Sequence, residues 1–256
     1  MCVMTTTSKI IDIEAINLSI GYKDYILLDN ISFNINKNDI FIIMGPSGCG
    51  KSSLLSVLTG LREPIDGSVF IDGYDFWHSD KQVRDVIMRK CGIMYQSGAL
   101  FTSMTLAENV ALPLQQYTTY SQREIDELVS LKLALVGLAG FENFYPSEIS
   151  GGMKKRAGFA RALALDPKIV YFDEPSAGLD PISSKLLDDL IIEINRNLGT
   201  TIVIVTHELS SIFAVGNNSI FLDPESKSII GYGNPKDLLK YPPNEKVLHF
   251  LTRGEK

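Results

Sequence analysis

Alternating apolar and polar positions mark the first part of the chain as β-structure. Ile11 and Ile13 alternate with polar residues in IIDIEAINLSI, and Ile31, Phe33 and Ile35 do so in NISFNINKND. A period of two residues is typical of a strand with one buried face. The polar stretch GYKD after the first segment is a turn signal. The pattern therefore predicts that the chain opens as an antiparallel β-sheet.

Short, continuous apolar runs then predict strands that are buried on both faces. The run from Ile40 to Met44 leads into a glycine-rich loop and then into KSSLLSVLTGL, which has helical spacing. Two further runs, KIVYFD and TIVIVTH, flank a helix expected over residues 183–198. The later stretch SIFLDPESKSIIGYG has the pattern of a hairpin. This alternation of strands and helices indicates an α/β fold.

The middle of the chain changes character and is predicted to be a helical insertion. Over residues 109–144 the apolar positions have helical spacing, and Ser121 with Glu124 forms a capping-box pattern. A further helix is expected over residues 153–165. Because no repeat or linker separates these segments, we expect one domain over residues 1–256, an α/β core with a helical arm.

Composition and charge narrow the classes of partner. The 256 residues are 45% apolar and 21% charged with a net charge of -6, which is ordinary for a globular protein and gives no electrostatic case for nucleic acid as the main partner. The apolar runs fall far short of the roughly 20 residues of a membrane-crossing helix, and MCVMTTTSK lacks a secretory pattern. We therefore expect a cytosolic chain. Cys2, Cys49 and Cys91 are too scattered to predict disulfides or a structural metal.

The clearest chemical motif is GPSGCGKS. It fits the pattern G-x-x-x-x-G-K-[ST] with Gly45, Gly50, Lys51 and Ser52, and it stands between a buried strand and a helix, which is the context that such a loop requires. Its glycines let backbone N–H groups surround phosphates, and the helix start adds a positive dipole. Lys51 would neutralise charge and Ser52 would offer a ligand to Mg²⁺. A chance glycine-rich turn is the alternative.

Cys49 lies inside this loop and allows two interpretations. Backbone donors and the nearby Lys51 would favour the thiolate, so that alkylation of the thiol would block ATP binding. Alternatively, Cys49 is simply a small residue whose thiol the loop shields.

Polar residues at the ends of predicted strands are candidates for catalysis. Burying Asp173 and Glu174 at a strand end is costly unless a cation or a proton transfer uses them, so Asp173 suits a Mg²⁺ shell and Glu174 suits the base that activates water. His207 ends another buried strand and is placed to reach a γ-phosphate. The alternatives are a solvated acidic turn and a structural histidine. Gln96 and Tyr22 are weaker candidates, for Mg²⁺ or water and for stacking on a purine.

A second helix start with anion-binding character appears far downstream, in the stretch SEISGGMKKRAG. Ser150 offers a hydroxyl, Gly151 and Gly152 allow close approach of the backbone, and the helix that follows presents free N–H groups. One chain therefore carries two separate segments suited to phosphate.

Together these motifs resemble the ATP-binding cassette (ABC) ATPases across nearly the whole chain. Their order is the aromatic Tyr22, the Walker A loop 45–52, the Q-loop Gln96, the signature 150–152, the Walker B strand 169–173 with Glu174, the D-loop 177–180 and the switch His207. The resemblance implies the fold of a P-loop NTPase. Its parts would be a RecA-like core, an N-terminal antiparallel β-subdomain and an inserted helical subdomain at about 97–165.

The resemblance also implies how the site is assembled. Members of this family act as head-to-tail dimers that bind and hydrolyse ATP between the Walker A loop of one chain and the signature of the other. Catalysis would then involve Glu174, His207 and Gln96, and Mg²⁺ would be held by Ser52, Gln96 and Asp173. The residues expected to contact ATP are Tyr22, Gly45, Pro46, Ser47, Gly48, Cys49, Gly50, Lys51, Ser52, Ser53, Ser150, Gly151, Gly152 and Asp180.

Finer features resemble the Mla-type ATPases of phospholipid transport, which work with MCE-domain proteins. Ile149 and Met153 replace the leucine and glutamine that are usual around the signature, and YQSGALFTSMTLAENVALPL, YPSEISGG and HFLTRG fit the same group. The partners implied are a second copy of the chain, an MlaE-type membrane permease, an MlaD-type MCE protein and often an MlaB-type STAS-domain protein, without nucleic acid. Segment 97–105 and the helical arm after it would receive the permease, with Phe101 and Met104 as candidate contacts and core packing as the alternative for Phe101.

This resemblance implies a motor that moves phospholipids between the inner and outer membranes from the cytoplasmic face of the inner membrane. The nearest alternative is the ATPase of an ABC importer for another small solute, which would differ only in its partners. A non-transport ABC ATPase would usually carry two cassettes or a coiled-coil insertion, and neither is present in this sequence. A purely regulatory nucleotide-binding module would not need Glu174 or His207.

Overall fold

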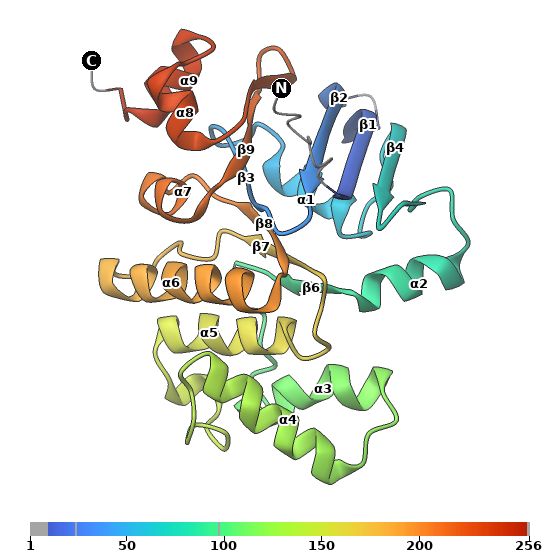
Figure 1. Ribbon diagram of the computed structural model, residues 1–256, viewed down its shortest axis with the longest axis vertical. Coiled ribbons are helices and arrows are strands. Elements are labelled where there is room, and N and C mark those ends of the chain that lie inside the picture. Colours follow the sequence, from blue (N-terminus) through green and yellow to red (C-terminus); the bar gives the residue numbers. More distant parts are fainter. Residues whose placement is uncertain (1–9, 24, 97, 255–256) are drawn as a thin grey trace, which may run out of the picture.

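The computed structural model describes residues 10–23, 25–96 and 98–254, so Cys2 and Ser97 lie outside the described residues. The strands form two sheets (Figure 1). The antiparallel sheet has the order β2-β1-β4-β5, with β1 (Ile11–Tyr22), β2 (Tyr25–Asn36), β4 (Asp66–Ile71) and β5 (Tyr74–Asp75). The larger sheet has the order β10-β9-β3-β8-β7-β6, with β3 (Ile40–Met44), β6 (Cys91–Met94), β7 (Ile169–Asp173), β8 (Thr201–Val205), β9 (Asn218–Asp223) and β10 (Ser228–Tyr232).

The larger sheet is parallel except for its edge strand β10, and its register aligns the strand ends that carry the candidate residues. Val205 of β8 lies opposite both Ile43 of β3 and Asp173 of β7. β6 pairs with β7 so that Met94 lies opposite Phe172. Because the carboxyl ends of parallel strands meet at one edge of a sheet, the segments that follow β3, β6, β7 and β8 all leave the sheet on the same side.

Two hydrophobic cores cover opposite faces of this sheet, because successive side chains of a strand point to opposite faces. Ile43 belongs to the core that contains α1 (Lys51–Leu58) and the antiparallel sheet. Ile42 belongs to the core that contains α5 (Gly151–Ala162) and α6 (Pro181–Leu198). Figure 1 shows α1 and α5 on opposite sides of the sheet. The two helix starts suited to phosphate are therefore held apart within one chain.

Among the described residues, the helical elements between β6 and β7 are α3 (Leu106–Tyr117), α4 (Gln122–Leu135), η1 (Pro146–Glu148) and α5. The predicted capping box of α4 is confirmed. The Glu124 N–H donates to Ser121 Oγ at 3.4 Å, and the Ser121 N–H donates to Glu124 Oε2 at 2.7 Å. The buried faces of these helices join the core on the α5 side of the sheet.

The remaining helices are α2 (Lys81–Arg89), α7 (Leu209–Val215), α8 (Pro235–Lys240) and α9 (Glu245–Leu251). The predicted fold class is confirmed, with an α/β core, an N-terminal antiparallel sheet and inserted helices. In the parts of the chain that the structure describes, no helix has the length and apolar character needed to cross a membrane.

Two helices begin earlier than their apolar patterns predict. α5 begins at Gly151 because the Ser150 hydroxyl caps it, and α6 begins at Pro181 because the Asp180 carboxylate caps it. Proline is also favoured at the first position of a helix, where no N–H donor is needed. In both cases the capping residue is a better guide to the helix start than the first apolar residue.

Candidate functional site

The loop between β3 and α1 has the backbone geometry of an anion cradle. Gly45, Gly48 and Gly50 have φ angles of 147°, 79° and 100°, a region that favours glycine. At Gly45 a Cβ would also lie 2.5 Å from the carbonyl oxygen of Leu222. α1 begins at Lys51 without a capping side chain or an acidic residue in its first turn. Its first N–H groups are therefore open to an anion.

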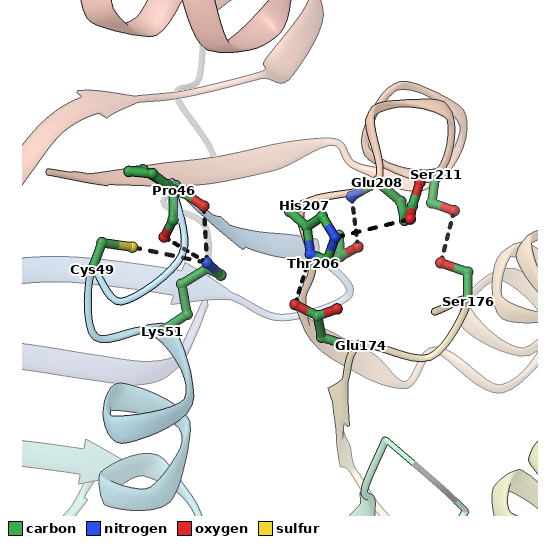
Figure 2. Close-up of polar contacts among 10 residues, drawn as sticks. Pro46, Cys49, Lys51, Glu174, Ser176, Thr206, His207, Glu208 and Ser211 are labelled. Carbon is green, nitrogen blue, oxygen red and sulfur yellow. Dashed lines mark hydrogen bonds and ion pairs between the residues drawn. The ribbon is translucent and has the colours of Figure 1, made fainter. Parts of the chain in front are cut away.

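The Lys51 side chain points into this loop (Figure 2). Its Nζ donates to the carbonyl oxygens of Gly45 and Pro46, each at 2.9 Å, and the residue is 8% exposed. These bonds hold one positive charge at the centre of the loop. Gly45 and Cys49 are also buried, whereas the predicted ligands in exposed or half-buried positions are Pro46, Ser47, Gly48, Gly50, Ser52 and Ser53.

The Cys49 thiol is buried, and this decides between its two interpretations. Cys49 is 1% exposed. Burial raises the pKa of the thiol, although Lys51, whose Nζ lies 4.0 Å from Sγ, opposes the shift. The expectation that the loop favours the thiolate is therefore wrong, because loss of solvation outweighs the nearby cation. The alternative interpretation, a shielded small residue, agrees with the structure.

Asp173 ends β7 with a carboxylate oxygen that has no hydrogen-bond partner in the described part of the chain. Its Oδ1 is buried and accepts no hydrogen bond from the described residues. Burial raises the pKa of Asp173 and the charge of Glu174 adds to this shift, while Ser52 and Lys51 oppose it. An unpaired buried carboxylate oxygen is costly, and an oxygen-seeking divalent cation would satisfy it. The Asp173 carboxylate and the Ser52 hydroxyl therefore fit a Mg²⁺ ion.

Glu174 and His207 are in direct contact (Figure 2). His207 Nδ1 lies 2.8 Å from Glu174 Oε1, and the two side chains are 50% and 17% exposed. Glu174 has a φ of 49°, which is uncommon for a residue with a side chain, and its N–H donates to the Val205 carbonyl at 2.8 Å. β8 thus fixes the backbone of Glu174 while the carboxylate faces His207. Strain of this kind clusters at functional sites.

Tyr22 ends β1, and its ring is already in contact with a cation. The guanidinium carbon of Arg62 lies 3.5 Å from the centre of the ring. Hydrogen bonding to the side chains of Ser53 and then Arg62 lowers the pKa of the Tyr22 hydroxyl. Arg62 was not singled out by its sequence context, because a lone arginine after a helix has no distinguishing pattern. Gln96 is exposed two positions beyond the end of β6, near the sheet edge where Asp173 lies.

The signature residues lie at the start of α5, on the face of the sheet opposite α1. Ser150 is exposed, and its Oγ accepts from the Met153 N–H at 3.2 Å. A Cβ added at Gly151 would meet no atom of the described residues within 4 Å. The structure brings Lys51, Asp173, Glu174 and His207 to the carboxyl ends of the parallel strands, whereas Ser150 begins a helix that packs on the face opposite α1.

The predicted D-loop, residues 177–180, has structural contacts at both of its ends. Asp180 caps α6 by accepting from the N–H groups of Ile182 and Ser183, each at 3.0 Å, and hydrogen bonds from Ser183 lower its pKa. The Ala177 carbonyl accepts a hydrogen bond from the buried side chain of Lys155 in α5. Lys155 has no distinguishing sequence pattern, because nothing in its spacing separates a buried lysine from a solvated one.

The segment expected to receive a membrane partner has an exposed aromatic side chain. Phe101 is 51% exposed, so its assignment to the core is excluded. Arg161 of α5 lies 5.9 Å from the Phe101 ring and donates to the Ala99 carbonyl at 2.8 Å, which ties this segment to the signature helix. Met104 is half-buried and lines a groove between α3 and α4 with Val129.

The fold and these contacts define a P-loop ATPase, and comparison with known proteins identifies its family. Residues 28–177, more than half of the chain, match the family described as ABC transporter. The chain therefore belongs to the ABC transporter family and is an ATP-binding, ATP-hydrolysing subunit. The family resemblance found in the motifs is confirmed.

Similar proteins match along most of the chain. It is 40% identical to the probable ribonucleotide transport ATP-binding protein mkl of Mycobacterium tuberculosis, over 94% of this chain and 67% of that protein. It is 36% identical to the intermembrane phospholipid transport system ATP-binding protein MlaF of Haemophilus influenzae, over 95% of this chain and 90% of that protein. A dimeric, post-hydrolysis structure of the ATP-binding cassette MJ0796 bound to ADP and Pi is 30% identical with a TM-score of 0.78, over 87% of this chain and 98% of that chain.

The burial of Cys49 predicts that its thiol reacts slowly with alkylating reagents. We expect iodoacetamide to modify Cys49 of the native chain at least roughly ten-fold more slowly than Cys49 of the urea-unfolded chain, because the thiol is both shielded and protonated. Mass spectrometry of the Cys49 peptide measures this rate. Cys91, whose pKa burial raises to about 12, is an internal control and should also react slowly. Fast modification of native Cys49 beside slow Cys91 would contradict the burial argument.

Proposed function

We propose that this chain is the ATPase subunit of an ABC transporter that moves phospholipids between the inner and outer membranes. It works as a head-to-tail dimer attached through a permease to the cytoplasmic face of the inner membrane. The contact between Glu174 and His207 is the observation that carries the hydrolytic mechanism. Similarity to MlaF over nearly the full length of both chains supports the lipid cargo.

The nucleotide is bound in loop 45–52 of each chain. Lys51 and the first N–H groups of α1 contact the phosphates, and the Tyr22 ring, with Arg62 on one face, stacks on the purine. Ser52, Asp173 and the amide oxygen of Gln96 would hold Mg²⁺, which would neutralise charge on the β- and γ-phosphates. The buried Oδ1 of Asp173, which has no partner among the residues that the structure describes, supports this assignment.

Glu174 acts as the general base toward the attacking water, and His207 contacts the γ-phosphate. The 2.8 Å contact between the two side chains holds the carboxylate in one orientation. Its backbone is fixed as well, by the hydrogen bond to the Val205 carbonyl. A base whose geometry is set in advance loses less entropy on reaching the transition state.

A second copy of the chain completes each site. Ser150, Gly151 and Gly152 contact the γ-phosphate of the nucleotide held by the other copy, and Asp180 lies near the same interface. The open space around Gly151 supports this arrangement, since the glycine has no steric reason within its own chain. The free N–H groups at the start of α5 and the exposed Ser150 hydroxyl are suitable phosphate donors.

The transporter contains, in this proposal, an MlaE-type permease, an MlaD-type MCE protein and an MlaB-type STAS-domain protein. Exposed Phe101 and the contacts of Arg161 support segment 98–105 as the place where the permease docks, because Arg161 connects that segment to the signature helix. Movement of the permease would then reach the part of the site that closes on ATP.

A solute importer is the second candidate, because the relatives named mkl are described as probable ribonucleotide transport proteins. The cassette supplies energy in both cases, while its membrane partners select the cargo. The discriminating property is therefore the set of proteins that bind the cassette.

Replacing the proposed base should separate ATP binding from hydrolysis. We expect Glu174→Gln to lower kcat by roughly 10² to 10⁴, because a positioned general base is lost, while ATP affinity changes little. Steady-state phosphate release and equilibrium binding of fluorescent ATP measure the two properties. Glu208→Gln is the matched control, since Glu208 lies 4.0 Å from the other ring nitrogen of His207. Hydrolysis near the wild-type rate in Glu174→Gln would contradict the assignment.

Isolation of the assembled transporter tests the cargo. When the tagged chain is purified in mild detergent from its native membranes, we expect a polytopic permease and an MCE-domain protein to co-elute with it. Lys51→Ala, which keeps the docking segment, should retain both partners. Co-elution with a different permease and a solute-binding protein would instead support the importer and overturn the phospholipid proposal.

A further inference from the structure

Three buried polar side chains connect the D-loop region to the segment after the switch histidine. Ser211 Oγ lies 3.0 Å from Asp188 Oδ2 and 3.4 Å from Ser176 Oγ. Ser176, Ser211 and Asp188 are only 4%, 3% and 6% exposed. They come from the turn after β7, from α7 and from α6, so the cluster joins three separate elements.

The cluster lies on the same two segments as the proposed catalytic pair, Glu174 and His207. Ser176 follows Glu174 by two residues, and Ser211 follows His207 by four. Figure 2 shows the Ser176–Ser211 contact beside the Glu174–His207 contact, so the same two segments are joined twice. Just beyond Ser176, the Ala177 carbonyl is held by Lys155, whereas Gly178 at the tip of the loop is exposed.

We propose that Asp188 is a positioning residue for ATP hydrolysis, which acts through Ser211 and Ser176 to fix the D-loop relative to the switch segment. Neither serine nor Asp188 contacts the nucleotide in this scheme. The inference rests on the proposed roles of Glu174 and His207. It adds the buried contacts that hold the segment after β7 in a fixed position relative to the segment after β8.

The donors and acceptors in this chain of hydrogen bonds depend on the protonation state of Asp188. Ser211 has a single hydroxyl proton, so it can donate to Asp188 or to Ser176 but not to both. When Asp188 is ionised, Ser211 donates to its carboxylate and Ser176 must donate to Ser211. When Asp188 is protonated, it can donate to Ser211, and Ser211 can then donate to Ser176. The charge of Asp188 therefore determines the direction in which the Ser176 hydroxyl points.

Asp188 changes charge within an accessible pH range. Burial raises its pKa to about 6, with hydrogen bonding to Ser211 opposing the shift and the charge of Asp189 adding to it. Lys185 and Asp189 of α6 and Glu208 before α7 line the same pocket. Lys155 of α5, the other helix packed on α6, reaches only as far as the Ala177 carbonyl. The ionised form thus predominates above about pH 6 and the protonated form below it.

Substitution of Asp188 by asparagine separates a positioning role from a structural one. The neutral amide resembles the protonated acid, so Asp188→Asn and wild type should hydrolyse ATP at similar rates near about pH 5, where wild-type Asp188 is protonated. Near about pH 8 we expect kcat of the variant to be about 3- to 10-fold below wild type, with KM for ATP unchanged.

Asp189→Asn is the matched control, because Asp189 is the adjacent acid of α6 and is exposed. Its rate relative to wild type should not vary with pH. Ser211→Ala removes the relay and keeps the carboxylate, and it should lower kcat at both pH values. A melting curve for each full-length variant shows that it is folded at both pH values.

A pH-independent ratio for Asp188→Asn, or an equal effect of Asp189→Asn, would overturn the inference and leave the proposed function standing. Absence of ATP hydrolysis by the wild-type chain at every pH, or full activity of Glu174→Gln, would instead contradict the proposed function. The two failures are therefore distinguishable.

Discussion

The parallel sheet keeps the two helix starts that we propose to bind phosphate on opposite faces, and the rest of the proposed mechanism depends on that separation. α1 follows the loop after β3 and belongs to the core on one face of the sheet, whereas α5 belongs to the core on the other face. Helix starts with open N–H groups attract phosphate, but Ser150 starts a helix on the face of the sheet opposite the α1 start of the same chain. In the proposed dimer, a symmetric pair of chains would resolve this, because each copy would offer its α5 start to the nucleotide of the other.

Two residues at this edge of the sheet are in unfavourable states when the chain is alone. Asp173 has a buried oxygen that accepts from no donor among the described residues, and Glu174 has a strained backbone. Each of these features costs free energy in the isolated chain. A triphosphate with its cation would compensate them together, so the binding of ATP and the closing of the dimer are expected to reinforce each other.

Much of this arrangement was predictable from sequence patterns, and the failures share one cause. The apolar runs of β3, β7 and β8 and the motif around Lys51 are local, so they indicated both the strands and the polar residues at their ends. The state of Cys49, the burial of Lys155 and the contacts of Asp188 depend on elements distant in the sequence. In Cys49 the local cation suggested a thiolate, but the tertiary fold removed the solvent that a thiolate needs.

A complementation assay measures most directly whether each chain supplies half of two sites. A Lys51→Ala chain lacks the phosphate loop function but keeps its signature, and a Ser150→Arg chain has the reverse defect. Each alone should be nearly inactive. An equal mixture should regain roughly a quarter of the wild-type ATPase rate, since half of randomly formed dimers contain one intact site of two. A mixture as inactive as its parents, or substantial activity in Ser150→Arg alone, would contradict a site shared between two chains.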